Sequence, residues 1–562
     1  MKTLPRTLQG LLLLLHCGNS LARGDDSHDV SALHGVVVSV ESHASEVGLE
    51  VLRRGGNAVD AAVATALALA VTHPAAGNIG GGGFMMIHHA KTGQTSCVEY
   101  REKAPAAATR EQFASHAEDM RGHLMVGVPG TVRGLALAHE KFGSMPWAEL
   151  VAPAIRLARD GFPMDEHLAR SLEGWLRQCK DFAEAQRIFR KPDGSAWQAG
   201  DRLVQSDLAQ TLTRIAELGP DAFYTGLVAD QIVKEMKTGS GLVTKQDLSA
   251  YRAQLRDPIR GSYRGYEILA PPPPSSGGTI LVEMLNILEH FDLAAQGWDA
   301  PATVHQMIEA MRLAYFDRAR YLGDPKFSDI PVARLTSKEY AKEQAARIQS
   351  DRAARSDELG MELLDTSEGT STTHFSIVDS AGNAVSNTYT LQDSHGSYVV
   401  VRGAGFLLNN EMTDFNLVPG RTDRLGHIGT PPNLIEPHKR MLSSQTPTLV
   451  FKDGRLVLVT GTPGGRTIIN TVLEVVTNVL DFHMTVRDAV DAPRLHHQWF
   501  PDRVSLEPKR LSDSTRQTLG AMGHEFSKAT HQEDAHSILV DPVTGLRHGA
   551  ADRRLSGRAA GY

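Results

Sequence analysis

Alternating apolar and polar side chains mark two neighbouring segments, 371–379 and 384–390. Both contain strand-forming residues such as Thr and Val, and the turn between them, 380–383, contains Gly and Asn. This pattern predicts a β-hairpin. The segment just before it, 365–371, is small and polar and has no apolar face to bury. A flexible, cleavable segment is therefore expected to lead directly into a strand that begins with Thr.

Other stretches have the periodicity of helices and buried strands. The run 58–71 is rich in Ala and apolar nearly all round, which predicts a buried helix, and Asn57 is a suitable N-cap for it. The apolar runs 36–40, 84–87 and 456–460 predict strands. Further helices are expected over 45–54, 135–142, 147–162, 165–184, 281–290, 302–321, 337–351 and 467–480.

This mixture of elements indicates an α/β or α+β protein. A length of 562 residues exceeds one ordinary domain, although a single large α/β unit is compatible with it. The chain is 41% hydrophobic and 22% charged, as expected for a globular protein, and its formal charge of −7 is spread along the sequence. There is no basic stripe, so nucleic acid is not expected as a partner.

The first 22 residues have the pattern of a secretory signal peptide. Lys2 and Arg6 supply the basic region, 8–15 is a short apolar core, and 20–22 is a small-residue cleavage site, so the mature chain is expected to begin at Arg23. This predicts a secreted or periplasmic protein. The apolar core is too short to span a bilayer, and no other run is long enough, so no membrane span is expected.

Cysteine use is sparse. Cys17 lies in the signal segment, where lipidation is disfavoured because His16 precedes it instead of a small residue. Cys97 and Cys179 remain after cleavage, which excludes a disulfide scaffold but leaves open whether the two pair with each other. The adjacent histidine pairs 88–89 and 496–497 have no carboxylate at metal-binding spacing, so no metal site is predicted.

Thr372 is the candidate nucleophile. A Thr hydroxyl is a poor nucleophile without a base, but an N-terminal Thr has its own α-amine, with a pKa of about 8, to accept the proton. The alternative is that Thr372 and Thr373 are ordinary strand residues, and for an isolated Thr-Thr-His this alternative would be favoured.

Two glycine-rich turns invite a chemical interpretation. The run 80–83 has no Lys-Ser/Thr and precedes a strand, so tight backbone packing explains it better than a phosphate loop. The turn 461–465 follows a strand and opens a helix, where backbone N–H groups suit developing negative charge. The alternative interpretation of 461–465 is a plain turn between a strand and a helix.

Charged residues provide a possible clamp for a zwitterionic substrate. Arg101 offers the planar, two-pronged cation that suits an α-carboxylate, although a surface ion pair with Glu99 or Glu102 would also explain it. Glu411 and Asp414 are spaced to hold an α-ammonium group, and a turn or cap role is the alternative for Asp414.

The block 371–415 resembles the small-subunit start of the γ-glutamyltranspeptidases, which are N-terminal nucleophile hydrolases made as one precursor. The similarity runs from about Gly35 to the last fifty residues. Further matching blocks follow in the family's order at 55–84, 98–110, 128–134, 270–278, 439–447 and 461–465.

The resemblance implies a fold, a processing step and an activity. The implied fold is a four-layer αββα sandwich, in which two stacked antiparallel sheets lie between helical layers and are shared by both halves of the precursor. Self-cleavage would give a large subunit, 23–371, and a small catalytic subunit, 372–562, which stay together as a heterodimer. The implied activity is that of a γ-glutamyltransferase and glutathione hydrolase, which passes the γ-glutamyl group to water, amino acids or peptides without a cofactor.

The resemblance also assigns roles to individual residues. Thr372 would be nucleophile and base, and Thr390 would hydrogen-bond it from across the hairpin. The glycine pair would form the oxyanion hole, and Arg101 with the serine pair would hold the substrate carboxylate. These pairs are Gly464 with Gly465 and Ser443 with Ser444.

The ammonium end of the substrate would be bound by Glu411 and Asp414. Gln392 stands where many family members have an Asn that contacts this ammonium group; Gln can make the same bond but is one methylene longer. The segment 416–437 resembles the family's lid loop over the acyl site.

Two alternatives are kept. A glutaryl-β-lactam acylase of the same family would have less use for Glu411 and Asp414, because glutaryl has no α-ammonium. A non-catalytic secreted binding protein would be expected to lose Thr372, Thr390 or the glycine pair, and all are present. The physiological donor and acceptor, the ratio of hydrolysis to transfer and the oligomeric state stay open.

Overall fold

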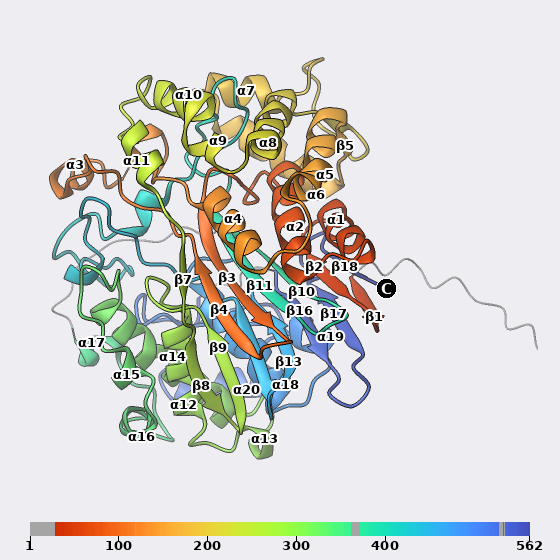
Figure 1. Ribbon diagram of the computed structural model, residues 1–562. Coiled ribbons are helices and arrows are strands. Elements are labelled where there is room, and N and C mark those ends of the chain that lie inside the picture. The colour runs from red at the N-terminus through yellow and green to blue at the C-terminus, as the bar shows by residue number, and fades with distance from the viewer. Residues whose placement is uncertain (1–27, 119, 361–370, 528–531, 533) are drawn as a thin grey trace, which may run out of the picture.

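The computed structural model describes residues 28–118, 120–360, 371–527, 532 and 534–562 (Figure 1). The predicted signal peptide, with Cys17 inside it, lies outside the described residues, as does most of the predicted polar linker 365–371.

Two seven-stranded antiparallel sheets form the centre of the described structure. Smaller two-stranded ribbons, β5 (Phe162–Pro163) with β6 (Arg202–Leu203) and β14 (Leu495–His496) with β15 (Ser505–Leu506), lie outside them. The first sheet has the order β18 (Arg558–Gly561), β2 (Val36–Ser39), β10 (Ser371–Val378), β11 (Ala384–Gln392), β3 (Gly82–His89), β4 (Gln94–Glu99) and β7 (Gln254–Arg256). The second has the order β1 (Asp29–Ala32), β17 (Arg547–Ala551), β16 (His536–Val540), β13 (Arg455–Thr460), β12 (Thr448–Lys452), β9 (Tyr266–Ala270) and β8 (Ile259–Tyr263).

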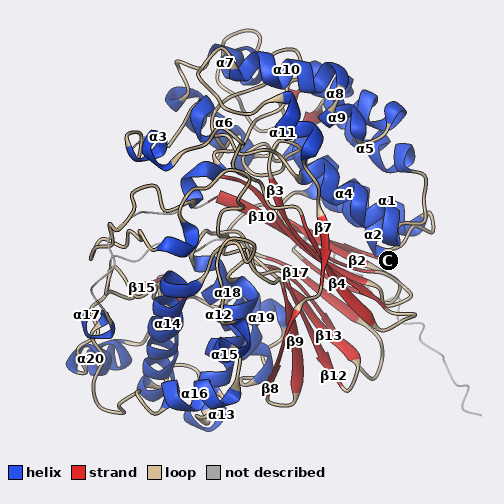
Figure 2. Cartoon of the chain, turned by 60° about the vertical axis from the view of Figure 1, so that its left-hand side comes forward, coloured by secondary structure: helices blue, strands red, loops and turns tan. Residues whose placement is uncertain are grey.

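Helices cover the outer faces of both sheets (Figure 2). The group nearer the first sheet is α1 (Ser42–Arg53), α2 (Ala58–Thr72), α3 (Arg110–Ala114), α4 (Thr131–Phe142), α5 (Trp147–Asp160), α6 (Glu166–Gln178), α7 (Ala183–Phe189), α8 (Ser206–Leu218), α9 (Asp221–Tyr224), α10 (Gly226–Met236) and α11 (Lys245–Ala250). The other group is α12 (Gly277–Leu288), α13 (Leu293–Gln296), α14 (Pro301–Tyr321), α15 (Val332–Leu335), α16 (Lys338–Ala345), α17 (Ser356–Leu359), α18 (Thr467–Leu480), α19 (Val486–Asp491) and α20 (Asp513–Ala521). Short 3-10 turns are η1 (His123–Met125), η2 (Glu411–Asp414) and η3 (Pro431–Asn433).

Successive side chains of a strand point to opposite faces of the sheet, and apolar side chains form a core on each face. In β3, Met85 and Ile87 pack against the first helical group, whereas Phe84 and Met86 point into the layer between the two sheets. This is the two-residue period of a strand that is buried on both faces. A third core joins the second sheet to helices such as α12, α14 and α18. Three cores between four layers confirm the expected αββα sandwich.

Local signals place α2 as expected. The Asn57 side chain accepts hydrogen bonds from the backbone N–H groups of Val59 and Asp60, and the Asp60 carboxylate accepts from the Asn57 N–H. This capping box satisfies N–H groups that a helix start leaves open. Every residue of α2 is buried, in agreement with its apolar surface.

The expected helix 165–184 is interrupted. It divides into α6 and α7, because the Gln186 side chain donates to the carbonyls of Leu176 and Cys179 at 2.9 and 3.3 Å and satisfies the end of α6. Both Cys97 and Cys179 are buried free thiols, so the described structure contains no disulfide between them.

Strands that precede the predicted cleavage site, between Ser371 and Thr372, are interleaved with strands that follow it. In the first sheet β10 pairs with β2 and β11 pairs with β3, and in the second sheet β17 pairs with β1 and β12 pairs with β9. A cut before Thr372 would therefore leave both parts within the same sheets. Among the described residues, no helix is both long and apolar enough to cross a membrane.

Candidate active site

Most of the predicted site residues line one small cavity at the end of the β10–β11 hairpin. Gln445 and Ile468 also line it and were not predicted, and Gly464, which was predicted, is next in the chain to a lining residue. The predicted residues that line it are Arg101, Thr372, Thr390, Gln392, Glu411, Asp414, Ser443, Ser444 and Gly465.

A break in strand register lies at the candidate nucleophile. Ser371 pairs with Gln392 and Thr373 pairs with Tyr389, so two residues of β11 oppose the single residue Thr372. A bulge of this kind re-aims the side chains beside it. β11 ends three residues after Tyr389, at Gln392, whose φ is +83°.

Thr390 is held against Thr372 by its neighbours. The two hydroxyl oxygens lie 3.4 Å apart, and the Gln392 N–H donates to the Thr390 hydroxyl at 2.7 Å. The Asn78 side chain donates to the Thr390 carbonyl at 2.9 Å. A Cβ on Gly81 would lie only 1.9 Å from that carbonyl oxygen, so only glycine fits there. The glycine run therefore serves tight packing, as predicted, and supports the site from behind.

Arg101 is buried, with 1% of its surface exposed. One guanidinium nitrogen lies 2.6 Å from a Glu411 carboxylate oxygen, and the other pairs with Asp414. The same guanidinium donates to the carbonyls of Met441 and Leu442 at 3.3 and 3.0 Å. Burial disfavours the charged form, but the two carboxylates outweigh it and raise the pKa of Arg101. A surface ion pair, the alternative from sequence, is wrong.

The site holds more carboxyl groups than its cation can balance. Glu102 is buried, 3.6 Å from Arg101, and burial raises the pKa of Glu102 to about 8 although Arg101 opposes the shift. Burial also raises the pKa of Glu411 well above its ordinary value. Protons retained on these groups limit the net negative charge of the dry cluster. Glu99 takes no part in it, because it pairs with Arg440 at 2.8 Å.

Gln392 contacts a carboxylate of the clamp. Its side-chain N–H donates to Asp414 Oδ1 at 3.0 Å, and this bond orients Asp414 beside Arg101. The longer side chain thus reaches the carboxylate of Asp414.

The serine pair is supported by elements distant in sequence. The Ser444 hydroxyl accepts from the Arg318 guanidinium of α14 at 2.9 Å, and the Ser443 hydroxyl accepts from the Gln445 N–H at 3.1 Å. The Ser276 N–H donates to the Ser443 carbonyl at 2.7 Å, and the Ser443 N–H donates to the Pro274 carbonyl at 2.9 Å. The proline-rich segment is therefore a folded support for the serine loop.

Gly464 and Gly465 form the turn between β13 and α18. Their φ angles of +127° and +58° lie in the left-handed region that favours glycine. The carbonyl of Gly464 accepts from both the N–H and the hydroxyl of Thr467, at 3.1 and 2.7 Å, which fixes the turn at the start of the helix. A helix start with open N–H groups favours negative charge nearby.

The expected lid segment 416–437 is anchored around the cavity. The Asn433 side chain donates to the Asp414 carbonyl at 2.7 Å and accepts from the Leu442 N–H at 2.9 Å. The Arg466 guanidinium donates to the Gly426 carbonyl at 2.7 Å. The segment therefore contacts both the carboxylate clamp and the glycine turn.

Sequence reasoning gave no role in the site to Asn78 and Arg318, and it named Glu102 only as a surface partner of Arg101. Asn78 and Glu102 lie in blocks that resemble the family, so these blocks could have pointed to both residues. Arg318 has no such signal, because 126 positions separate it from Ser444 and only the packing of α14 brings them together.

Comparisons with known proteins agree with this geometry. The family model for gamma-glutamyltranspeptidase matches residues 44–562. A glutathione hydrolase proenzyme from Escherichia coli (strain K12) is 45% identical over 545 residues, which cover 96% of this chain and 93% of the relative. Another, from Pseudomonas sp. (strain A14), is 44% identical over 549 residues and 95% of each chain. The crystal structure of cephalosporin acylase from Bacillus halodurans has a TM-score of 0.85 at 29% identity, with 98% of this chain and 99% of that chain covered.

The match to the family model covers nearly the whole chain, and the two sheets with their helical layers are common to this chain and the acylase. The chain is therefore a member of the γ-glutamyltranspeptidase family of enzymes.

Proposed function

We propose that this protein is a γ-glutamyltransferase and glutathione hydrolase that creates its own nucleophile by cutting the Ser371–Thr372 bond. The observation that carries the proposal is the position of Thr372, 3.4 Å from Thr390, in one cavity with a cation and carboxylates suited to a free amino-acid head group. The relatives named glutathione hydrolase proenzyme support both the activity and the processing.

Processing would begin with attack of the Thr372 hydroxyl oxygen on the carbonyl carbon of Ser371. The peptide C–N bond breaks as the C–O bond forms, and the proton of the hydroxyl passes to the leaving nitrogen. Water then hydrolyses the ester, which returns the hydroxyl and leaves a free α-amine on Thr372. This amine would be the base of the mature enzyme, because its pKa of about 8 suits proton transfer near neutral pH.

In the mature enzyme, Thr372 would attack the γ-amide carbonyl of the donor. The N–H groups of Gly464 and Gly465 would stabilise the oxyanion, and the departing amine would take the proton that the Thr372 α-amine had accepted. Water, an amino acid or a short peptide would then attack the ester carbonyl and take the γ-glutamyl group, and the Thr372 hydroxyl would be restored with the proton that the acceptor gives up. Thr390 would orient the Thr372 hydroxyl in both steps.

The charged residues of the cavity favour a glutamyl head group over a glutaryl one. The α-carboxylate of a glutamyl group would compete with Glu411 and Asp414 for Arg101, and would also meet Ser443 and Ser444. Its α-ammonium would bind the two carboxylates that Arg101 releases. A glutaryl group has no ammonium, so it would leave these buried carboxylates without a partner.

Secretion belongs to the same proposal. The signal-peptide pattern of residues 1–22 supports export, and the interleaved strands support a stable pair of subunits, 23–371 and 372–562, after cleavage.

Substitution of the candidate nucleophile tests the processing step. Thr372→Ala should give one uncut chain on a denaturing gel and by intact mass, whereas the wild type should give two. Thr373→Val is the matched control: the Thr373 hydroxyl is buried and has no hydrogen-bond partner among the described residues, and Val has the same shape. If Thr372→Ala is cut as efficiently as Thr373→Val, the nucleophile is misassigned.

Substrate comparison tests the activity. The wild type should release p-nitroaniline from γ-glutamyl-p-nitroanilide at least about 100-fold more efficiently than from glutaryl-p-nitroanilide, because the buried carboxylates pair only with the former. A reversed preference would identify a glutaryl acylase. Absence of turnover with both substrates in correctly cut protein would favour a binding protein.

A further inference from the structure

A cluster of metal-ligand side chains lies outside the candidate active site. His305 and Glu309 are four residues apart on one face of α14, and His524 follows α20. One ligand atom from each residue lies within 4.8 Å of the other two, and all three residues are buried. The spacing of histidines and acids along the chain does not predict this cluster, because 219 positions separate His305 from His524.

Hydrogen bonds fix which histidine nitrogens face the centre of the cluster. His305 Nε2 lies 2.7 Å from the Gln349 carbonyl and must donate to it, since a carbonyl only accepts. His305 Nδ1 is then an acceptor, and it lies 2.8 Å from His524 Nε2, which donates to it. A histidine whose outer N–H is held by a carbonyl has its inner nitrogen oriented as a metal ligand.

One atom of the cluster is left without a partner. In this tautomer His524 Nδ1 carries a lone pair, it is buried, and no described residue hydrogen-bonds to it. A neutral imidazole is the form that binds a metal ion, and in this tautomer each of the two histidines has one unprotonated nitrogen with a lone pair.

Glu309 is oriented in a similar way. Its carboxylate accepts from the Arg312 Nε–H at 3.3 Å and from the Ala354 N–H at 3.2 Å. The Arg312 charge is shared with Asp502, with which its guanidinium also pairs.

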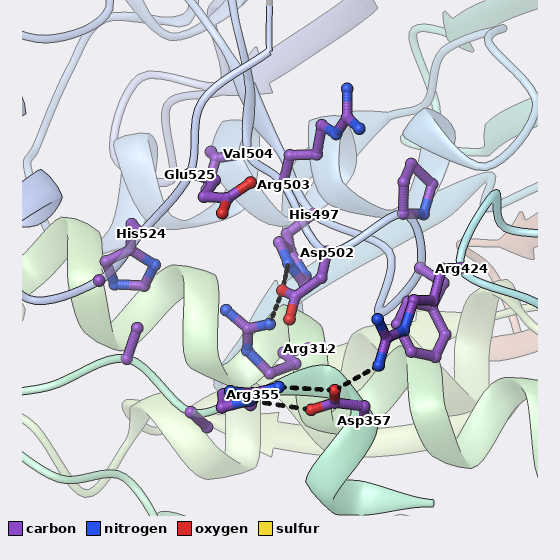
Figure 3. Close-up of a pocket in the computed structure, with 15 residues that line it drawn as sticks. Arg312, Arg355, Asp357, Arg424, His497, Asp502, Arg503, Val504, His524 and Glu525 are labelled. Carbon is purple, nitrogen blue, oxygen red and sulfur yellow. Dashed lines mark hydrogen bonds and ion pairs between the residues drawn. The ribbon is translucent and has the colours of Figure 1, made fainter. Parts of the chain in front are cut away.

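Cavities lead to the cluster from two sides. One of about 520 Å³ is lined by His524 together with Arg312 and Asp502 (Figure 3). Another of about 240 Å³ is lined by Glu309 and Gln349, and residues 353–355 line both. His524 and Glu309 therefore each border open space.

From this geometry we propose that His305, Glu309 and His524 form a binding site for one divalent first-row transition-metal ion of the Zn²⁺ class. Two imidazoles and one carboxylate are a ligand set that Zn²⁺ and neighbouring ions accept, with further positions left open. Binding at His524 Nε2 moves its proton to Nδ1, so the imidazole stays neutral. The ion would replace the hydrogen bond between the two histidines and join the end of α20 to α14.

The site is separate from the candidate active site. His305 and Arg318, which supports Ser444, are 13 residues apart on α14, or about 20 Å along the helix axis. The proposal does not depend on the proposed transferase activity, and its test needs no substrate.

Metal content and a cobalt spectrum test the proposal on the full-length protein, purified without a histidine tag. EDTA-treated wild type is incubated with Zn²⁺, desalted and measured for bound metal, and Co²⁺ is titrated in parallel to record its visible d–d absorption. Glu309→Gln and His524→Gln are the test variants. His88→Gln is the matched control, because His88 is buried like His524 but its side chain hydrogen-bonds only to Thr95 among the described residues.

Wild type and His88→Gln should bind one equivalent of Zn²⁺ and show the Co²⁺ bands, whereas both test variants should bind at least about tenfold more weakly and lose the bands. Circular dichroism shows whether the variants are folded. A wild type that retains no Zn²⁺ above either variant and gives no Co²⁺ bands would overturn the proposal, because that measurement does not depend on a variant that folds.

Discussion

Replacement of Asp414 by Asn would remove one charge from the proposed substrate clamp while its shape stays the same. The Asp414 side chain is 14% exposed, pairs with Arg101 and accepts from the Gln392 side chain at 3.0 Å. Asn keeps an oxygen that can accept from Gln392. The variant therefore tests the charge of Asp414 with little change in packing.

The expected magnitude follows from the bond that is lost. A hydrogen bond to a charged group contributes about 1.5–3 kcal/mol, which corresponds to a fall of about 10- to 150-fold in kcat/KM for a γ-glutamyl substrate. A full ion pair at an effective dielectric constant of 20 sets an upper bound of about 4 kcal/mol. The loss should stay well below that bound, because Glu411 remains to bind the ammonium group.

Three p-nitroanilides distinguish this effect from general damage. Asp414→Asn should lower kcat/KM for the γ-glutamyl and 4-aminobutyryl substrates, which both have the ammonium group, and should leave the glutaryl substrate unchanged. Arg101→Lys should instead lower kcat/KM for the γ-glutamyl and glutaryl substrates, which both have the carboxylate, and should leave the 4-aminobutyryl substrate unchanged. Equal losses on all three substrates in Asp414→Asn would refute the assignment of the ammonium site.

Three further outcomes are expected. Thr390→Val should slow both chain cleavage and turnover by about 100-fold, since it removes the hydroxyl next to Thr372. Thr390→Ser keeps a hydroxyl and should retain most of both rates. Cleavage is followed on a denaturing gel and turnover in the anilide assay. Gly81→Ala should lower the melting temperature and impair cleavage because its Cβ would meet the Thr390 carbonyl, whereas Gly520→Ala in α20, with no atom within 4 Å of the new Cβ, should be neutral or stabilising. Burial raises the pKa of Glu474 from 4.5 to about 7, although Arg510 opposes the shift. The folded state thus holds a proton that the unfolded chain releases, so this contribution to the free energy of unfolding is present below pH 4.5 and lost as pH rises through 7. Denaturant titrations of Glu474→Gln should lack this slope, and an unchanged slope would contradict the shift.

Local sequence patterns determined much of the secondary structure. The capping box at Asn57, the β10–β11 hairpin and helix α18 follow from signals that are contiguous in the chain, because caps, turns and periodicity act over a few residues. The same reasoning failed where a distant or side-chain contact ends an element, as Gln186 does at the end of α6.

The resemblance to the γ-glutamyltranspeptidases supplied the layered fold and the roles expected of the site residues. The structure brings nine of the ten predicted residues to one cavity, but the cleavage at Ser371–Thr372 and the individual roles stay predictions. Periodicity alone could not have given the order of the sheets, because a buried strand shows which faces are covered and not which strand lies beside it.

The order of the amino acids specifies which chemical groups this protein has: a Thr at the start of a strand, an Arg, paired acids and a glycine turn. Which of these groups meet depends on the packed fold, in which Gln392 contacts Asp414, Arg318 contacts Ser444 and His305 contacts His524. The physical reason is that propensity and hydrophobic pattern depend on near neighbours in the chain. Contacts between side chains far apart in sequence depend instead on how whole sheets and helices pack.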